Sequence, residues 1–249
     1  MKRFIKFGLA ALFIFGFVRA TCGKPKPTII TVKPELKIKD YVYFHNMSIT
    51  YDGHHYFTIN GGNTDYCKLN EYNAKGDFII SYNVELDSRA IFYNTADDKL
   101  YVKAFGADLY EIFLDSQYGE IILAHVFNDE NSSPALSADG NFIYEFVNGE
   151  VRVLDFTDGD EIRTFNLANY FDEYPYNVTI AASAKNLFVW GGKDEVSVYD
   201  LEGKYVGNIK LPIAGYGFSL SYCNGMLWVA EDADGSTDGG NGYWYGFKI

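Results

Sequence analysis

Short runs of alternating apolar and polar residues, separated by turns rich in glycine and aspartate, make up most of the chain. In LFVWGGKDEVSVYDLEGKYVGNIKLP, residues 187–212, apolar side chains recur at every second position, which is the period of a half-buried strand. The GGKD and LEGK segments predict hairpin turns, because glycine adopts positive φ at no steric cost. Three strands alone leave open edges and an uncovered face, so the stretch predicts one unit of a larger array.

This pattern occurs five times along the chain. The strands that precede the short, mostly glycine-bearing turns begin at Tyr56, Leu100, Ile143, Leu187 and Leu227, which gives spacings of 44, 43, 44 and 40 residues. Each copy has another apolar run upstream and further strands downstream. Four strands in about 40–45 residues is the period of a propeller blade. The sequence therefore predicts an all-β fold: a five-bladed β-propeller of four-stranded antiparallel blades.

The fifth copy is one strand short, because YWYGFKI (243–249) is its third strand. TIITVKP (28–34) is the first candidate for the missing outer strand, and LKIKD (36–40) is the second. An N-terminal strand that completes the last blade closes the ring and removes an exposed edge. We therefore expect a single propeller domain over residues 28–249.

Two segments carry a resemblance to a known repeat. VRVLD (151–155) and VSVYD (196–200) have the form V-x-V-x-D, and the first lies in DGNFIYEFVNGEVRVLDFTDGDEIRTFNL, residues 139–167. This order of aspartate-glycine turn, aromatic strand and glycine turn resembles the YVTN/NHL type of β-propeller repeat. The resemblance implies the fold and says little about activity, because the motif residues are structural.

The N-terminus has the features of an export signal. MKRFIK is basic, FGLAALFIFGFV (7–18) is apolar but shorter than the roughly 20 residues of a membrane-spanning helix, and Ala20 suits cleavage. We expect residues 1–20 to be a signal peptide and residues 21–27 a tether. Cys22 resembles the lipidated cysteine of a bacterial lipoprotein, which implies a membrane tether. The expected location is exported: periplasmic, cell-surface or secreted.

Charge and motifs exclude several functions. The formal net charge is −12, and removal of residues 1–20 would leave 17 basic against 33 acidic residues, or −16. Such a chain repels phosphate backbones, so we expect no nucleic-acid partner. Cys67 and Cys223 are expected to be unpaired thiols. The sequence contains no nucleotide-binding, zinc-protease or serine-hydrolase motif, and we expect no cofactor except Ca²⁺.

Calcium is suggested by EDADGSTDGGNG (231–242), which replaces a short turn. Asp232, Asp234 and Asp238 present three carboxylates to a cation that prefers oxygen ligands. The alternative interpretation is a solvated glycine-aspartate hairpin loop.

A ligand-binding face is suggested by NYFDEYPYN (169–177), which links the third and fourth blades. Links between blades and loops between second and third strands share one face of a propeller, around the channel mouth. Aromatic faces with a few charges suit sugars, peptides or aromatic ligands. The alternative is packing between blades. The candidate ligand-binding residues are Arg89, Phe105, Asp172, Glu173, Tyr174, Trp190 and Tyr216.

These features favour an exported, non-catalytic, monomeric binding module for a carbohydrate, peptide or protein. The alternative is a propeller enzyme, either a hydrolase or lyase or a glutaminyl cyclotransferase. HNMSITYDGHHYFTINGG (45–62) resembles the first blade of plant-type glutaminyl cyclotransferases but lacks their Gln-Gly pair and catalytic glutamate. A carboxylate of raised pKa at the channel mouth would favour the enzyme. An aromatic, carboxylate-poor mouth would favour binding.

Overall fold

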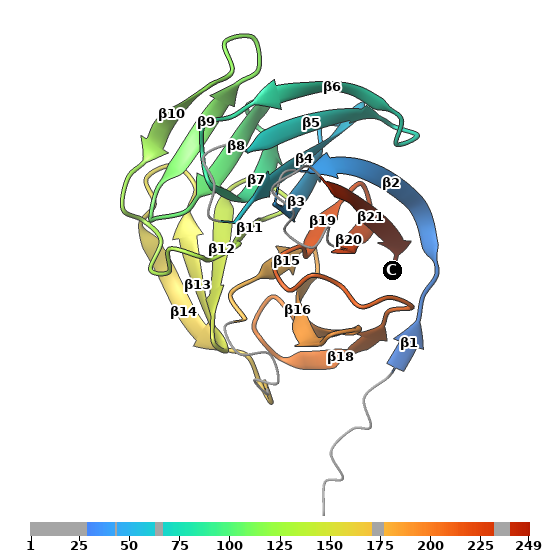
Figure 1. Ribbon diagram of the computed structural model, residues 1–249. Coiled ribbons are helices and arrows are strands. Elements are labelled where there is room, and N and C mark those ends of the chain that lie inside the picture. The colour runs from blue at the N-terminus through green and yellow to red at the C-terminus, as the bar shows by residue number, and fades with distance from the viewer. Residues whose placement is uncertain (1–28, 43, 63–66, 171–176, 232–239) are drawn as a thin grey trace, which may run out of the picture.

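Five antiparallel sheets stand side by side around a central channel in the computed structural model (Figure 1). The structure describes residues 29–42, 44–62, 67–170, 177–231 and 240–249. No helix in these ranges is long and apolar enough to cross a membrane. The predicted five-bladed β-propeller is confirmed. In every blade, the second strand begins one residue before the position expected from the repeat.

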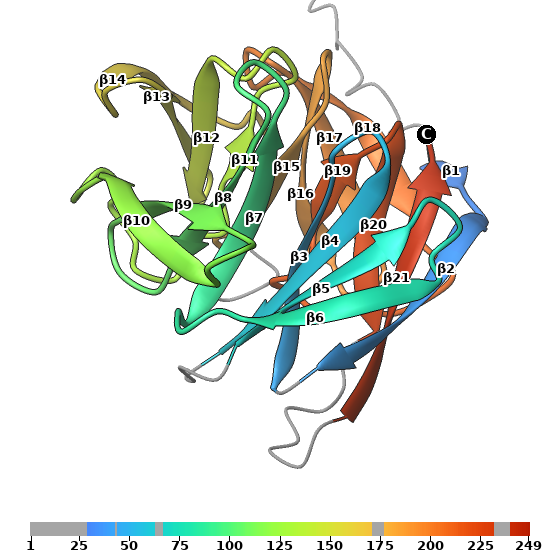
Figure 2. The same ribbon diagram turned by 90° about the horizontal axis from the view of Figure 1, so that it is seen from above.

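Each blade runs from an innermost strand at the channel to an outermost strand, as Figure 2 shows for the twisted sheet β3–β6. Blade one contains β3 (His45–Tyr51), β4 (His55–Gly61), β5 (Lys68–Asn73) and β6 (Phe78–Asn83). Blade two contains β7 (Ser88–Asn94), β8 (Lys99–Ala104), β9 (Leu109–Phe113) and β10 (Tyr118–Leu123). Blade three contains β11 (Ala135–Leu136), β12 (Phe142–Val147), β13 (Glu150–Asp155) and β14 (Glu161–Asn166).

The two remaining blades share the N-terminal segment. Blade four contains β15 (Ile180–Ala182), β16 (Asn186–Gly192), β17 (Glu195–Asp200), β18 (Tyr205–Lys210) and the added strand β1 (Ile29–Thr31). Blade five contains β19 (Ser221–Cys223), β20 (Met226–Glu231), β21 (Gly240–Lys248) and β2 (Pro34–Val42).

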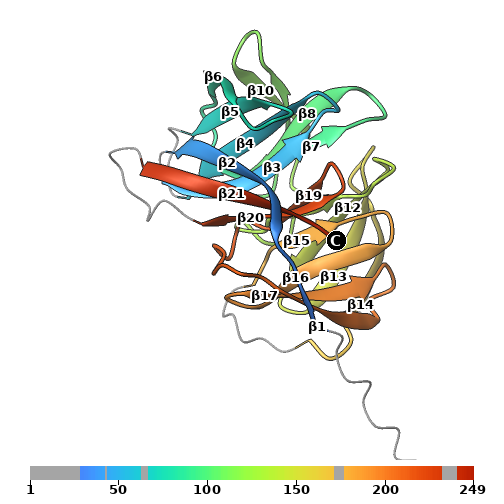
Figure 3. The ribbon, with the colours of Figure 1, turned by 90° about the vertical axis from the view of Figure 1, so that its right-hand side faces the viewer.

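An N-terminal strand closes the ring, as predicted, but it is the second candidate that does so. β2 includes LKIKD and pairs antiparallel with β21, from Pro34 opposite Phe247 to Val42 opposite Gly240. TIITVKP was the wrong choice: its residues Ile29–Thr31 form β1, which pairs parallel with β18 of blade four. The chain then crosses to blade five (Figure 3). The preceding segment thus covers a neighbouring sheet edge instead of supplying the missing strand.

Asp40 joins the two ends of the ring. Its side chain is fully buried on β2, and its oxygens accept bonds from Trp244 Nε1 of blade five at 2.9 Å and from three side chains of blade one. These three donors are Asn46 Nδ2 at 3.0 Å, Asn70 Nδ2 at 2.7 Å and the Tyr72 hydroxyl at 2.5 Å. Burial raises the pKa of Asp40, and the hydrogen bonds from Tyr72, Trp244 and Asn70 counter that shift in part. The carboxylate therefore links blade five to blade one across the closure.

The core lies between the blades because each sheet buries both faces. Phe188, Trp190 and Phe247 pack between blades four and five, and Met47 and Ile91 pack between blades one and two. Outermost strands are more exposed: Phe78, Ile79 and Ile80 of β6 are each 44% exposed or more. Successive side chains of an inner strand therefore pack against the two neighbouring blades in turn. They do not alternate between a core and solvent.

Candidate functional site

The channel is bordered by the innermost strands β3, β7, β11, β15 and β19, each of which forms one edge of its sheet. Hydroxyl side chains connect these edges from blade to blade. Ser221 Oγ accepts the N–H of Ile49 at 3.3 Å, and Thr50 Oγ1 accepts the N–H of Tyr93 at 3.0 Å. Ser133 Oγ donates to the carbonyl of Arg89 at 3.0 Å. Serine and threonine thus satisfy edge groups that have no strand partner on the channel side.

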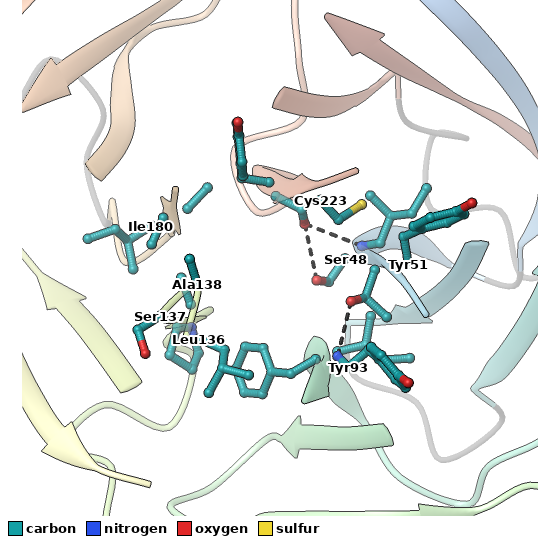
Figure 4. A pocket seen from close by; sticks show the side chains of 18 of the residues that line it. Ser48, Tyr51, Tyr93, Leu136, Ser137, Ala138, Ile180 and Cys223 are labelled. Atoms are coloured by element: carbon teal, nitrogen blue, oxygen red, sulfur yellow. Dashed lines mark hydrogen bonds between the residues drawn. The ribbon is translucent and has the colours of Figure 1, made fainter. Parts of the chain in front are cut away.

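A cavity of about 240 Å³ occupies the channel at the end formed by the turns between first and second strands. Figure 4 shows Ser48, Ser137, Ala138, Ile180 and Cys223 around it. Ser48 Oγ and Ser221 Oγ lie 3.1 Å apart on its wall. Phe92 and three tyrosines add aromatic surface; the tyrosines are Tyr51, Tyr93 and Tyr222.

The lining of this channel cavity contains no aspartate, glutamate, lysine, arginine or histidine. Its ionisable groups are phenols and one thiol. Burial raises the pKa of Cys223, so the thiol stays protonated at neutral pH and is a poor nucleophile. Burial also raises the pKa of Tyr222. The cavity therefore offers neutral hydrogen-bonding groups and aromatic surface, with no acid–base pair or activated nucleophile among its lining residues.

Four of the predicted ligand-binding residues are among the described residues, and they come from segments at the opposite end of the channel: Arg89, Phe105, Trp190 and Tyr216. Arg89 is 3% exposed, forms an ion pair with Asp87 at 2.6 Å, and lies 5.2 Å from the ring centre of Phe105. Phe105 is 47% exposed. Tyr216 stacks on His45 with ring centres 4.7 Å apart. Arg89 and Phe105 therefore lie together, and Phe105 offers surface to a ligand.

Trp190 is a correction to the predicted site. Its side chain is 1% exposed and packs with Phe188 and Val196 in the core between blades four and five. Gly215 leaves room for its ring, because a β-carbon at that position would collide with the indole. The aromatic pattern did not distinguish an exposed ring from one that fills the space between blades. Trp190 is a packing residue.

The other predicted residues lie outside the described residues. They are Asp172, Glu173 and Tyr174 of the ligand set, Asp232, Asp234 and Asp238 of the calcium loop, and Cys22. Within the described ranges, no group of three His, Cys, Asp or Glu side chains could hold a metal ion. Cys67 is buried, and no disulfide joins it to Cys223.

Sequence reasoning missed a buried charge cluster beside Arg89. Lys103 Nζ donates to the carbonyls of Asp129 at 3.2 Å and Glu130 at 2.6 Å. The buried Glu145 carboxylate accepts the N–H groups of Asn128 at 2.9 Å and Asp129 at 3.1 Å. The positive Lys103 and the negative Glu145 thus both bind backbone groups of the segment that links blades two and three. Lys103 and Glu145 each lie within a strand whose other residues are mostly apolar. A charged residue at such a position is the sequence feature that could have predicted a buried charge.

The lowered pKa of Lys103 predicts that the stability of the protein depends on pH. Burial, followed by the nearby Arg89 charge, lowers the pKa of Lys103 to about 7, whereas the unfolded chain has the ordinary value of 10.5. The unfolded state therefore binds more protons between these values. The free energy of unfolding should rise with pH above about 7, by up to about 1.4 kcal/mol per pH unit, and fall as the pH drops through 7.

Denaturant titrations at several pH values between about 7 and 9 measure this slope. Lys103→Met should remove it, because methionine has a similar length and no proton to exchange. Cysteine and tyrosine ionisation is common to both proteins and cancels in their difference. Equal slopes in the two proteins would contradict the lowered pKa.

Comparison with known proteins identifies a structural neighbour but no sequence family. The chain is similar to the crystal structure of Myxococcus xanthus glutaminyl cyclase, with a TM-score of 0.63 and 7% sequence identity. The match covers 90% of this chain and 98% of that chain. No family model matches the sequence, and no curated protein matches it. At this identity the likeness concerns the fold alone.

Proposed function

We propose that this protein is an exported, non-catalytic binding module that holds a small neutral ligand in the channel cavity. The observation that carries the proposal is the lining, which combines serine hydroxyls and aromatic rings with no carboxylate, lysine, arginine or histidine side chain. A volume of about 240 Å³ lies below the usual range for ligand pockets, roughly 300–1,000 Å³, so the cavity suits only a small ligand. The ligand class is a saccharide or another small molecule rich in hydroxyl or amide groups.

The cavity lies on the face opposite the one proposed from sequence. Ser137, Ala138 and Asn224 place its rim at the turns between first and second strands. Phe105 and Tyr216 belong to the other face, where the exposed ring of Phe105 offers aromatic surface to a larger partner, such as a peptide. We assign the small ligand to the channel cavity because residues from all five blades form it and offer neutral hydrogen-bonding groups beside aromatic rings.

The alternative is an enzyme, in particular a glutaminyl cyclase such as the structural neighbour. Residues 45–62 contain a single acidic side chain, Asp52. Its Oδ1 accepts the N–H groups of His54 at 2.7 Å and His55 at 2.6 Å, so the carboxylate stabilises a turn. An assay for cyclisation of peptides with N-terminal glutamine distinguishes the two functions, and turnover above background would favour the enzyme.

Export and a YVTN/NHL-type repeat are part of this proposal. Supporting them are the basic and apolar N-terminal segments, the small residue at position 20 and the V-x-V-x-D strands. The intact mass of native protein tests for loss of residues 1–20 and for a lipid on Cys22.

Blocking the cavity tests the binding function. Ala138 is exposed on the rim, so Ala138→Trp should fill the mouth without disturbing the core. We expect a hit on a glycan array of neutral saccharides for the unmodified protein, and a loss of at least about tenfold in affinity for the variant. Ala74→Trp is the matched control, because Ala74 is an exposed alanine in an outer turn that does not line the cavity. Equal binding by all three proteins would exclude the channel cavity as the site.

A further inference from the structure

A second cavity, of about 810 Å³, opens between blades four and five. It is distinct from the channel cavity, although Tyr222 lines both. Its walls are mainly apolar, and the rings of Phe188 and Tyr222 stack at its inner end with centres 5.6 Å apart. Its apolar lining is Val32, Phe188, Val198, Val206, Ile209 and Tyr222, with Ile249. We call it the interblade cleft.

The way the ring closes explains why the cleft is open. In other blades, the hairpin between third and fourth strands folds against the preceding blade. A β-carbon on Gly203 of blade four would lie 2.6 Å from the ring of Phe165 in blade three. One on Gly76 of blade one would lie 2.9 Å from Ile38 in blade five. A β-carbon on Gly159 of blade three would likewise collide with the side chain of Val126.

Blade five has no such hairpin. Its third strand, β21, ends at Lys248, and its fourth strand, β2, starts at Pro34 after the chain has crossed from blade four. Figure 3 shows the end of β21 beside this crossing. The gap between blades four and five therefore has no turn to cover its apolar walls. Val206, which is 53% exposed, and Ile249, which is 45% exposed, border it.

The charged side chains that line the cleft are both positive, although the protein is acidic. The chain has 33 acidic and 21 basic residues, but the charged side chains that line the cleft are Lys185 and Lys248. Both are exposed, and within the described part of the chain neither forms an ion pair. An apolar cleft bordered by two free ammonium groups is complementary to a molecule with an apolar body and an anionic end.

We propose that the interblade cleft binds a single-chain fatty carboxylate, with the acyl chain on the apolar walls and the carboxylate at Lys185 and Lys248. The volume lies within the range of small-molecule sites, roughly 300–1,000 Å³, which suits one acyl chain rather than the two chains of a phospholipid. Apolar burial supplies most of the affinity, and the lysines orient the ligand. This site is independent of the channel cavity and its ligand.

Titration calorimetry of the full chain with sodium oleate, below its micelle concentration, tests the proposal. We expect one site with a micromolar Kd. Val206→Glu places a charge on an exposed position of the apolar wall and should weaken binding at least about tenfold, with little effect on melting. The double variant Lys185→Glu/Lys248→Glu should weaken it by a similar factor. Methyl oleate, which has no charge, should bind the unmodified protein more weakly than oleate.

The control for net charge is the double variant Lys75→Glu/Lys204→Glu, because both lysines are exposed, neither lines the cleft, and the net charge changes by the same amount as in Lys185→Glu/Lys248→Glu. It should leave the Kd within about twofold. Ala138→Trp should also bind oleate normally, which separates this site from the channel cavity. Absence of saturable binding would overturn the proposal. Equal weakening by Lys75→Glu/Lys204→Glu and by Lys185→Glu/Lys248→Glu would overturn it too, since the effect would then be one of overall charge.

Discussion

Asp40→Ala is expected to lower the free energy of unfolding by about 3–5 kcal/mol, one of the two largest effects of a single substitution that the structure predicts. The substitution removes the acceptor of four side-chain donors. Trp244 Nε1 and the Tyr72 hydroxyl are then left buried without the acceptor that Asp40 provides to each of them. Removing the carboxylate also removes its own burial cost, which keeps the loss below the sum of four bonds.

Denaturation by urea, followed by tryptophan fluorescence, measures the effect. Asp40→Asn keeps the volume but turns an amide N–H₂ toward donors, so we expect a loss of at least about 2 kcal/mol. Glu35→Ala is the matched control, because Glu35 is an exposed acidic residue on the same strand and should change stability by less than about 0.5 kcal/mol. Similar stabilities for Asp40→Ala and Glu35→Ala would show that the closure does not depend on Asp40.

Trp190→Ala is expected to destabilise the protein by about 3–5 kcal/mol, as large-to-small changes of buried aromatic residues do. The indole is 1% exposed and its Nε1 has no hydrogen-bond partner in the described residues, so the cost is that of a cavity between blades four and five. Ligand binding in the channel cavity should be retained in the folded fraction, because Trp190 does not line it.

Phe105→Ala separates packing from surface exposure. Phe105 is 47% exposed and contacts Arg89, so its truncation should cost less than about 1 kcal/mol. Melting temperatures of the two variants provide the comparison. If Trp190→Ala melted like the unmodified protein while losing affinity for a ligand, Trp190 would be a binding residue after all.

The repeat made the fold predictable from sequence. Strands at Tyr56, Leu100 and Leu187 are local features: two-residue alternation and glycine turns report which segments are strands and how many blades they form. The missing strand of the fifth copy also predicted closure by the N-terminus. The choice between TIITVKP and LKIKD was not local, because both segments alternate and either can pair with an edge. Four side chains donate hydrogen bonds to Asp40 of LKIKD, and these bonds stabilise LKIKD, rather than TIITVKP, as the strand that closes the ring.

The candidate sites were less predictable from sequence than the fold, because they depend on the tertiary structure. Along the chain, Trp190 and Phe105 are both aromatic residues near the end of the second strand of a blade. The packing of blade four on blade five buries Trp190, whereas Phe105 stays exposed. The channel cavity is formed by residues from all five blades, so no segment contains its pattern.

The sequence by itself determined the blade count, the strand order within a blade and the acidic character, because periodicity and charge are properties of short segments and of composition. The tertiary structure alone decided which strand closes the ring, where Lys103 and Glu145 become buried charges, and why a cleft opens beside Val206. These features depend on contacts between residues far apart in the chain. A repeat fixes how each blade is built, whereas the differences among blades arise where two of them meet.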